Sequence, residues 1–152
     1  MYNREALEII KNVSEIFKVL MVVGPRQVGK STLLLSLKPD NMEYVTLDDE
    51  ILRKQAQKDP KMFLTEHPAP LFIDEVQYAP QLFSYIKIMV DKNDNNDQYW
   101  LTGSQAFKLM KNASESLAGR VGIINLNSFT YSKIIQNEKK ELFNPAHFKK
   151  VL

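Results

Sequence analysis

Apolar residues in this chain either form short continuous runs or recur every three or four positions. Continuous runs are typical of parallel strands covered on both faces, and the wider spacing is typical of helices. The runs and other strand-forming segments predict strands over residues 19–23, 43–47, 71–73, 99–102 and 121–126. The wider spacing predicts helices over residues 4–17, 31–37, 49–58 and 82–90. This alternation, without repeats, predicts an α/β fold with a parallel five-stranded sheet flanked by helices.

The first predicted strand continues directly into the loop GPRQVGKS, which matches the phosphate-binding pattern G-x-x-x-x-G-K-[ST]. Gly24 and Gly29 let successive backbone N–H groups turn toward phosphate oxygens, and the following helix adds its N-terminal dipole. Lys30 can reach the β- and γ-phosphates, and the Ser31 hydroxyl can complete a Mg²⁺ shell. Such a pattern also occurs by chance, but its place between a strand and a helix favours a P-loop that binds a nucleoside triphosphate.

Two carboxylates, Asp74 and Glu75, follow the third predicted strand in the sequence LFIDE. Ligands of open α/β sheets collect at the carboxyl ends of the strands. Asp74 would hold Mg²⁺ directly or through water, and Glu75 could polarise the water that attacks the γ-phosphate. The alternative is that the pair only caps the strand and faces solvent. Its position after a P-loop and a further strand favours the catalytic interpretation.

Four further polar residues are candidates for the same site. Thr102 or Ser104, in LTGSQ, could contact the γ-phosphate or the attacking water, or the serine could cap the following helix. Arg120, in SLAGR, could reach a γ-phosphate in its own subunit or a neighbour's, or could be a surface arginine after a glycine turn. Arg26, within the P-loop, could flank the nucleotide or pair with an acidic neighbour.

The bulk composition is that of a globular domain, with 44% hydrophobic and 25% charged residues. The net charge of +2 argues against a dedicated nucleic-acid binder. The chain has no cysteine, which excludes disulfides and cysteine metal sites. His67 and His147 have no partners at metal-ligand spacing. No secretory core or membrane-spanning run is evident, so a cytoplasmic domain without membrane contact is expected.

Several motifs, taken in order, resemble the AAA-type P-loop ATPase domain of a large group of prokaryotic proteins. They are GPRQVGKSTLL, LDD at residues 47–49, LFIDEVQYAP, LTGSQ and SLAGRV. The resemblance extends from the first helix to about Ile135. It implies an AAA+-like core with the third and fourth strands beside the P-loop strand. It also implies ATP as the nucleotide, with Mg²⁺, and a separate C-terminal domain of uncharacterised function.

The resemblance assigns roles to individual residues. Asp74 and Glu75 are similar to the Walker B pair, Ser104 falls at the sensor-1 position, and Arg120 matches the family's glycine–arginine pair. The Walker A segment supplies the nucleotide contacts, which are Gly24, Pro25, Arg26, Gln27, Val28, Gly29, Lys30, Ser31 and Thr32.

The chain departs from the family pattern in two places. Ser128 and Lys133 stand where such proteins usually have a proline and a glutamate, which affects turn geometry and not the nucleotide site. The chain also ends early, without a C-terminal domain or helical lid. We therefore expect an ATPase domain over residues 1–138 and the start of a linker or truncated C-terminal region over 139–152.

The favoured hypothesis is an ATP-binding domain that hydrolyses ATP slowly and acts as a switch for its missing C-terminal domain, a partner or a homo-oligomer. Turnover by the fragment alone is expected to be weak or absent. One alternative is a small-molecule phosphotransferase, with Lys108 and Lys111 as candidate basic residues near the phosphates. Another is a nucleic-acid-associated ATPase, which is motivated by the lysines at positions 139, 140, 149 and 150, although such runs are usually solvated faces.

Overall fold

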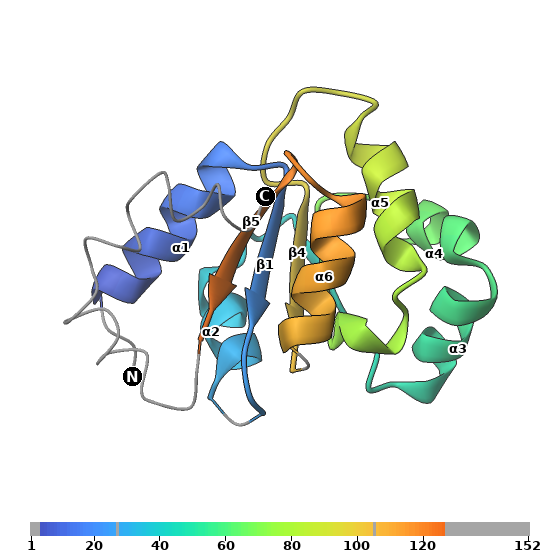
Figure 1. Ribbon diagram of the computed structural model, residues 1–152, viewed down its shortest axis with the longest axis horizontal. Coiled ribbons are helices and arrows are strands. Elements are labelled where there is room, and N and C mark those ends of the chain that lie inside the picture. Colours follow the sequence, from blue (N-terminus) through green and yellow to red (C-terminus); the bar gives the residue numbers. More distant parts are fainter. Residues whose placement is uncertain (1–3, 27, 105, 127–152) are drawn as a thin grey trace.

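Five parallel strands form one sheet in the order β2-β3-β4-β1-β5 (Figure 1). The computed structural model describes residues 4–26, 28–104 and 106–126. The strands are β1 (Val19–Val23), β2 (Glu43–Thr46), β3 (Leu71–Asp74), β4 (Tyr99–Gly103) and β5 (Val121–Asn125). Every predicted strand is present with its ends within one residue, so the parallel α/β fold is confirmed.

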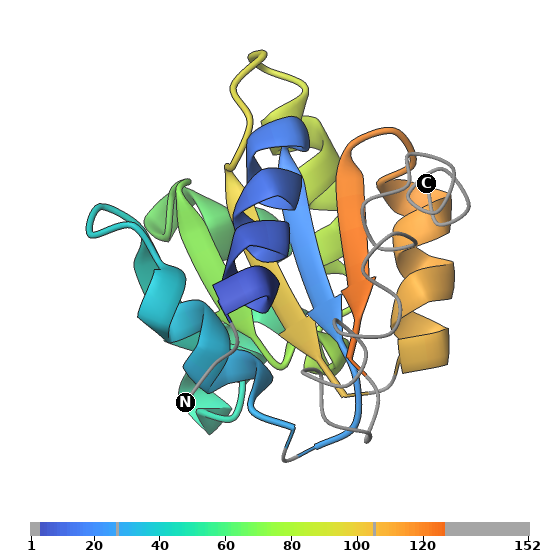
Figure 2. The same cartoon turned by 90° about the vertical axis from the view of Figure 1, so that its left-hand side faces the viewer.

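Helices cover both faces of the sheet and make a three-layer arrangement. Figure 2 shows α1 (Arg4–Ile16) and α2 (Lys30–Leu37) together in front of one face. The opposite face is covered by α3 (Glu50–Lys58), α4 (Pro60–Glu66), α5 (Leu82–Val90) and α6 (Ala106–Ser116). Within the described residues, no helix has both the length and the apolar character that crossing a bilayer requires.

The central strand β1 explains why its sequence is continuously apolar. Val19, Met21 and Val23 belong to the core under α3 to α6, whereas Leu20 and Val22 belong to the core under α1 and α2. All five side chains are fully buried. Because successive strand residues face opposite sides, a strand covered by helices on both sides needs apolar residues at every position.

Helix α4 was absent from the sequence prediction, which ended a helix before Pro60 and placed nothing after it. Pro60 does end α3, but it also starts α4, because proline in the first turn has no backbone N–H to leave unpaired. Asp59 supports this start, since its carboxylate accepts a hydrogen bond of 3.0 Å from the backbone N–H of Met62. A short 3-10 helix, η1 (Val76–Tyr78), follows β3 and was also not predicted.

The strand order corrects one expectation and places the candidate site. Only β4 of the expected pair adjoins β1; β3 lies beyond β4, and β5 occupies the other side of β1. The register pairs Val23 with Gly103 in β4 and with Asn125 in β5. Since all strands are parallel, the segments that leave β1, β3 and β4 meet at one edge of the sheet.

Candidate nucleotide-binding site

The loop between β1 and α2 borders a hollow of about 290 Å³ at this edge of the sheet. The hollow is lined by Arg26, Gly29, Lys30, Ser31, Thr32 and Glu75. Gly29 has a φ of 86° immediately before α2, a conformation that glycine adopts without steric cost. The N-terminus of α2 therefore opens toward the hollow, and its free N–H groups and dipole favour an anion there.

Gly24 is required by a close backbone approach. A Cβ atom at this position would lie 1.8 Å from the carbonyl oxygen of Leu126. That segment is fixed in place by a hydrogen bond of 2.7 Å from the Leu126 N–H to the carbonyl of Val23. The first glycine of the loop thus lets the end of β5 pack against the start of the P-loop.

Substituting Gly24 with alanine is expected to destabilise the fold, because the Leu126 backbone must shift to accept the methyl group. We expect a loss of about 1–3 kcal/mol in the free energy of unfolding, as for other overpacked sites. Urea denaturation followed by circular dichroism measures it. Pro25→Ala, at the exposed neighbouring position, is the control and should change stability by about 1 kcal/mol or less. Equal stability of Gly24→Ala and the wild type would contradict the steric argument.

Lys30 is buried at the floor of the hollow, with only 5% of its surface exposed. Its ammonium group donates hydrogen bonds to the carbonyl oxygens of Gly24, at 2.9 Å, and Pro25, at 2.8 Å. Burial lowers the pKa of the Lys30 ammonium, and the negative charges of Glu75 and Asp74 oppose that shift. The cation is therefore held beside the loop where phosphate oxygens could approach it.

Asp74 gathers three hydroxyl groups from three different elements. Oδ1 accepts a hydrogen bond of 2.8 Å from the Ser31 hydroxyl and another from Thr102, while Oδ2 accepts one of 2.8 Å from the Tyr44 hydroxyl. The Ser31 hydroxyl and the Asp74 carboxylate are oxygen ligands of the kind that Mg²⁺ prefers, and Mg²⁺ in phosphate sites completes its shell with water and phosphate. These residues fit the ion, although no cluster of three or more acidic or histidine ligands occurs among the described residues.

Glu75 adopts the left-handed conformation, with φ 59° and ψ 47°, immediately after β3. Such a conformation is uncommon for residues other than glycine, and it occurs often at functional sites. The Glu75 N–H donates a hydrogen bond of 3.3 Å to the Thr102 hydroxyl. Glu75 lines the hollow together with P-loop residues, and only 8% of the residue is exposed.

Thr102 and Ser104, the two hydroxyl residues of the segment LTGSQ, have different surroundings. Thr102 is fully buried, and its hydroxyl both donates to Asp74 and accepts from the Glu75 N–H. Ser104 lies just beyond β4, partly exposed, and its oxygen accepts a hydrogen bond of 3.1 Å from the side-chain amide of Gln77. Thr102 therefore holds Asp74 and Glu75 through buried hydrogen bonds, whereas the Ser104 side chain remains accessible to solvent.

A match between the sequence and a family model identifies the family. Residues 17–135 match the family model described as an AAA domain. This chain belongs to that family. It is an AAA-type P-loop ATPase domain, and the α/β architecture with five parallel strands is that of P-loop ATPases.

Other proteins resemble this chain in sequence or in fold. Two uncharacterized proteins, from Mycobacterium bovis and Mycobacterium tuberculosis, are 30% identical over 127 residues. The match covers 84% of this chain but 29% of each relative, so the chain spans less than a third of their length. A Walker-type ATPase of Pyrococcus abyssi has a similar fold, with a TM-score of 0.58, 17% identity, and coverage of 93% of this chain and 58% of that protein.

Arg26 of the ATPase domain contacts a tyrosine rather than an acidic neighbour. Its guanidinium donates a hydrogen bond of 2.9 Å to the Tyr78 hydroxyl, and this contact raises the pKa of Arg26. The Tyr78 ring in turn lies 3.9 Å from the guanidinium carbon of Arg53 on α3. The P-loop is thereby connected to η1 and α3, a link that the sequence prediction did not include.

Arg120 lies at the opposite edge of the sheet from the P-loop. It precedes β5, and its carbonyl accepts a hydrogen bond from Val19 at the start of β1. At about 3.3 Å per residue, the length of β1 separates it from the hollow by more than an arginine side chain can span. Its guanidinium instead makes two hydrogen bonds to Asp91, of 2.7 and 2.9 Å, and lowers the pKa of that carboxyl group. The interpretation of Arg120 as a finger in its own subunit is therefore wrong; contact with a neighbour's nucleotide stays a prediction.

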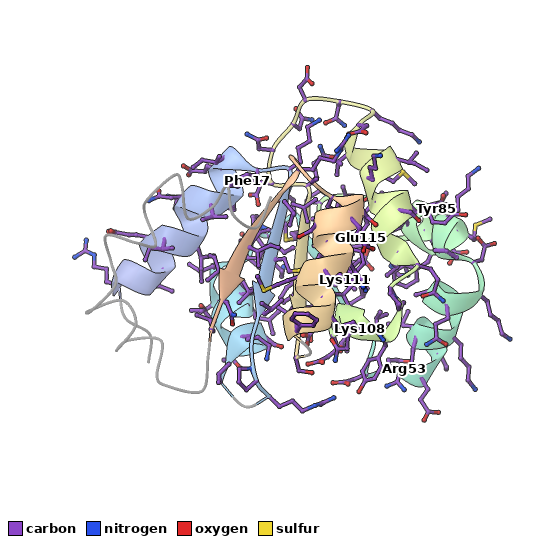
Figure 3. All side chains as sticks on the ribbon, viewed as in Figure 1. Phe17, Arg53, Tyr85, Lys108, Lys111 and Glu115 are labelled. Atoms are coloured by element: carbon purple, nitrogen blue, oxygen red, sulfur yellow. The ribbon has the colours of Figure 1, made fainter. Side chains whose placement is uncertain are left out.

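The other predicted residues divide between the loop, the surface and undescribed segments. Val28 packs against the core under α1 and α2, whereas Pro25 and Thr32 are exposed. His67 lies 2.8 Å from the Glu43 carboxylate, away from the hollow. Lys108 and Lys111 project from the exposed side of α6 (Figure 3) and do not line the hollow, so they give the phosphotransferase alternative no support. Gln27, Ser128, Lys133, His147 and the C-terminal lysines lie outside the described residues.

Tyr44 is a contact that the sequence prediction missed. It lies on β2, packs edge-on against Phe72 with ring centroids 5.0 Å apart, and donates to Asp74. Burial and the hydrogen bond to Asp74 raise the pKa of the Tyr44 hydroxyl, so it remains a donor at physiological pH. Nothing in the local sequence of β2 indicates this role, because it depends on β2 lying next to β3.

Changing Tyr44 to phenylalanine is expected to weaken Mg²⁺-dependent nucleotide binding about tenfold, the effect of losing one hydrogen bond to a charged group. Binding in EDTA should be unaffected, because only the orientation of the Asp74 carboxylate changes. Titration of Mg²⁺ at fixed ATP, followed by calorimetry, gives the measurement. Tyr85→Phe on α5 (Figure 3) is the matched control and should leave Mg²⁺ dependence unchanged. The same Mg²⁺ dependence in Tyr44→Phe and the wild type would rule out the positioning role.

Proposed function

We propose that this domain binds ATP with Mg²⁺, hydrolyses it slowly, and uses the two nucleotide states to switch an attached domain or partner. One observation carries the proposal. Lys30, Ser31 and Glu75 line a single hollow, and the Ser31 hydroxyl donates to the Asp74 carboxylate, although these residues come from segments more than forty positions apart in the sequence. A cation, metal-binding oxygens and a general base in one place are what phosphoryl transfer to water requires.

Each residue has a defined task in this proposal. The backbone N–H groups of the P-loop and the Lys30 ammonium bind the phosphates, and Ser31 and Asp74 hold Mg²⁺. When bound, the ion would neutralise charge on the phosphate oxygens. Glu75 orients the attacking water and accepts its proton, while the Ser104 hydroxyl donates to the γ-phosphate or to that water.

The switch role rests on the size of the relatives. The chain covers 29% of each mycobacterial relative, so much of such a protein lies outside this domain and could respond to the nucleotide. A homo-oligomer, in which Arg120 serves a neighbouring site, is part of the same proposal. The absence of cysteine fits a reducing compartment, and we propose the cytoplasm.

Calorimetric titration with ATP, GTP and ADP in Mg²⁺, followed by an assay of phosphate release, tests this function. We expect ATP and ADP to bind with micromolar dissociation constants, ATP to bind more weakly in EDTA, and phosphate to be released slowly. Adenine preference is inferred from the family and is tested by the comparison with GTP. Failure of all three nucleotides to bind would refute the proposal, and binding without any phosphate release would restrict it to a nucleotide sensor.

A further inference from the structure

Gln77 connects Glu75, which lines the hollow, to Ser104, which lies just beyond β4. It lies on η1, two positions after Glu75, and its side chain is partly buried. Its amide nitrogen donates to the Glu75 carboxylate at 2.5 Å and to the Ser104 hydroxyl oxygen at 3.1 Å. One side chain therefore joins the end of β3 to the end of β4, and neither the sequence motifs nor the family match assigns it a role.

The chemistry of the partners fixes how this amide is oriented. An ionised Glu75 carboxylate can only accept hydrogen bonds, so the nitrogen of Gln77 and not its oxygen must face it. The second N–H hydrogen is then directed to Ser104. The amide oxygen faces the backbone of Gly103, where a Cβ atom would lie 2.9 Å from it, and it has no hydrogen-bond partner among the described residues.

This orientation determines what Glu75 and Ser104 can still do. The Ser104 oxygen accepts from Gln77, which leaves the serine proton to be donated toward a ligand in the hollow. Only Oε2 of Glu75 is held by Gln77, which leaves Oε1 to accept a proton from water. The hydrogen bond from the Glu75 N–H to Thr102 holds the left-handed main chain from which this carboxylate extends.

We propose that Gln77 is a positioning residue that couples recognition of the γ-phosphate by Ser104 to the orientation of Glu75. The inference rests on the proposed function of this site and adds to it a specific discrimination between triphosphate and diphosphate. A γ-phosphate that accepts a hydrogen bond from the Ser104 hydroxyl orders Ser104, Gln77 and Glu75 together. ADP has no γ-phosphate, so it gains nothing from the same chain of hydrogen bonds.

The test compares Mg²⁺-dependent binding of ADP and of a non-hydrolysable ATP analogue by calorimetry, which needs no turnover. Gln77→Met keeps the size of the side chain and removes its hydrogen bonds. We expect the affinity for the analogue to fall about tenfold, the effect of losing one charge-assisted hydrogen bond, and the affinity for ADP to stay within about twofold. Gln81→Met, at an exposed position close in sequence, is the matched control and should change neither affinity.

Coupling between the two residues gives a second, independent readout. Ser104→Ala should lower the affinity for the analogue to a similar extent. The double variant should bind the analogue no more weakly than either single variant, because the two residues act through one chain of hydrogen bonds. Additive losses, equal losses for ADP and the analogue, or no loss in Gln77→Met would each overturn the proposal. If Gln77→Met does not fold, as judged by circular dichroism, Gln77→Glu replaces it; its carboxylate repels Glu75, and the same selective loss is expected.

Failure of the inference and failure of the proposed function are distinguishable in the wild-type protein. If neither nucleotide binds, the proposed function itself is wrong and the role of Gln77 fails with it. If ADP binds as tightly as the analogue, the nucleotide site stands but recognition of the γ-phosphate through Ser104 and Gln77 is refuted. A wild-type preference for the analogue that disappears in Gln77→Met supports both.

Discussion

Replacing Lys30 with alanine is expected to abolish nucleotide binding, with the affinity for ATP and Mg²⁺ reduced at least about 100-fold. The ammonium lies 2.8–2.9 Å from two P-loop carbonyl oxygens, in a site where only 5% of the residue is exposed. Its removal leaves these carbonyls facing incoming phosphates without an intervening cation. The loss of two charge-assisted hydrogen bonds from the Lys30 ammonium to the β- and γ-phosphates, at about 1.5–3 kcal/mol each, accounts for an effect of this size or more. Calorimetry with ATP in Mg²⁺ measures the effect.

Lys38 provides a matched control for this variant. Its ammonium also donates to two backbone carbonyl oxygens, those of Pro39 at 3.2 Å and Met42 at 2.7 Å, but it lies at the other end of α2 from the hollow. Lys38→Ala should therefore bind ATP like the wild type. Unchanged ATP affinity in Lys30→Ala, or an equal loss in both variants, would contradict the assignment of Lys30 as the phosphate-binding cation.

Substituting Glu75 with glutamine is expected to leave ATP binding within about twofold and to reduce hydrolysis by at least about 100-fold, the usual contribution of a general base. Glutamine has the size of glutamate and preserves the backbone, but its amide cannot accept the proton of the attacking water. The loss should fall on the rate of the chemical step and not on nucleotide affinity. Single-turnover phosphate release with protein in excess over ATP measures it even if turnover is slow.

Glu66→Gln is the control for this variant, because Glu66 is an exposed glutamate at the end of α4 and does not line the hollow. Its rate should equal that of the wild type. If Glu75→Gln hydrolyses ATP at the wild-type rate, Glu75 is not the base. If it loses ATP binding instead, its carboxylate serves mainly to organise the P-loop.

The strands could be predicted well because a parallel strand that is covered by helices on both faces is a continuous run of apolar residues in the sequence. The apolar run from Val19 stops at Val23, directly before Gly24, and β1 also ends at Val23. Prediction was weaker where one residue has two roles. Pro60 both ends α3 and begins α4, and a pattern that treats proline only as a helix terminator misses the second helix. The 3-10 turn after Glu75 has too few residues for any period to appear.

The candidate site divides in the same way. The P-loop could be predicted because its function requires particular residues at fixed spacing, and Asp74 and Glu75 because they follow an apolar strand. Tyr44 and Gln77 could not, because each reaches the site across neighbouring strands: Tyr44 from β2 to β3, and Gln77 from the end of β3 to the end of β4. Arg120 is the opposite case. The sequence suggested it for the site, but it lies at the other end of the strands from the P-loop.

The sequence by itself thus determined the fold class, the phosphate-binding loop and the acidic pair, because continuous apolarity and fixed local spacing are properties of neighbouring residues. The tertiary structure alone decided the strand order, in which β4 separates β1 from β3. That order placed Ser31, Thr102 and Tyr44 around Asp74, brought Gln77 between Glu75 and Ser104, and moved Arg120 away to Asp91. These contacts depend on which distant segments pack side by side, and no local pattern in the chain records that choice.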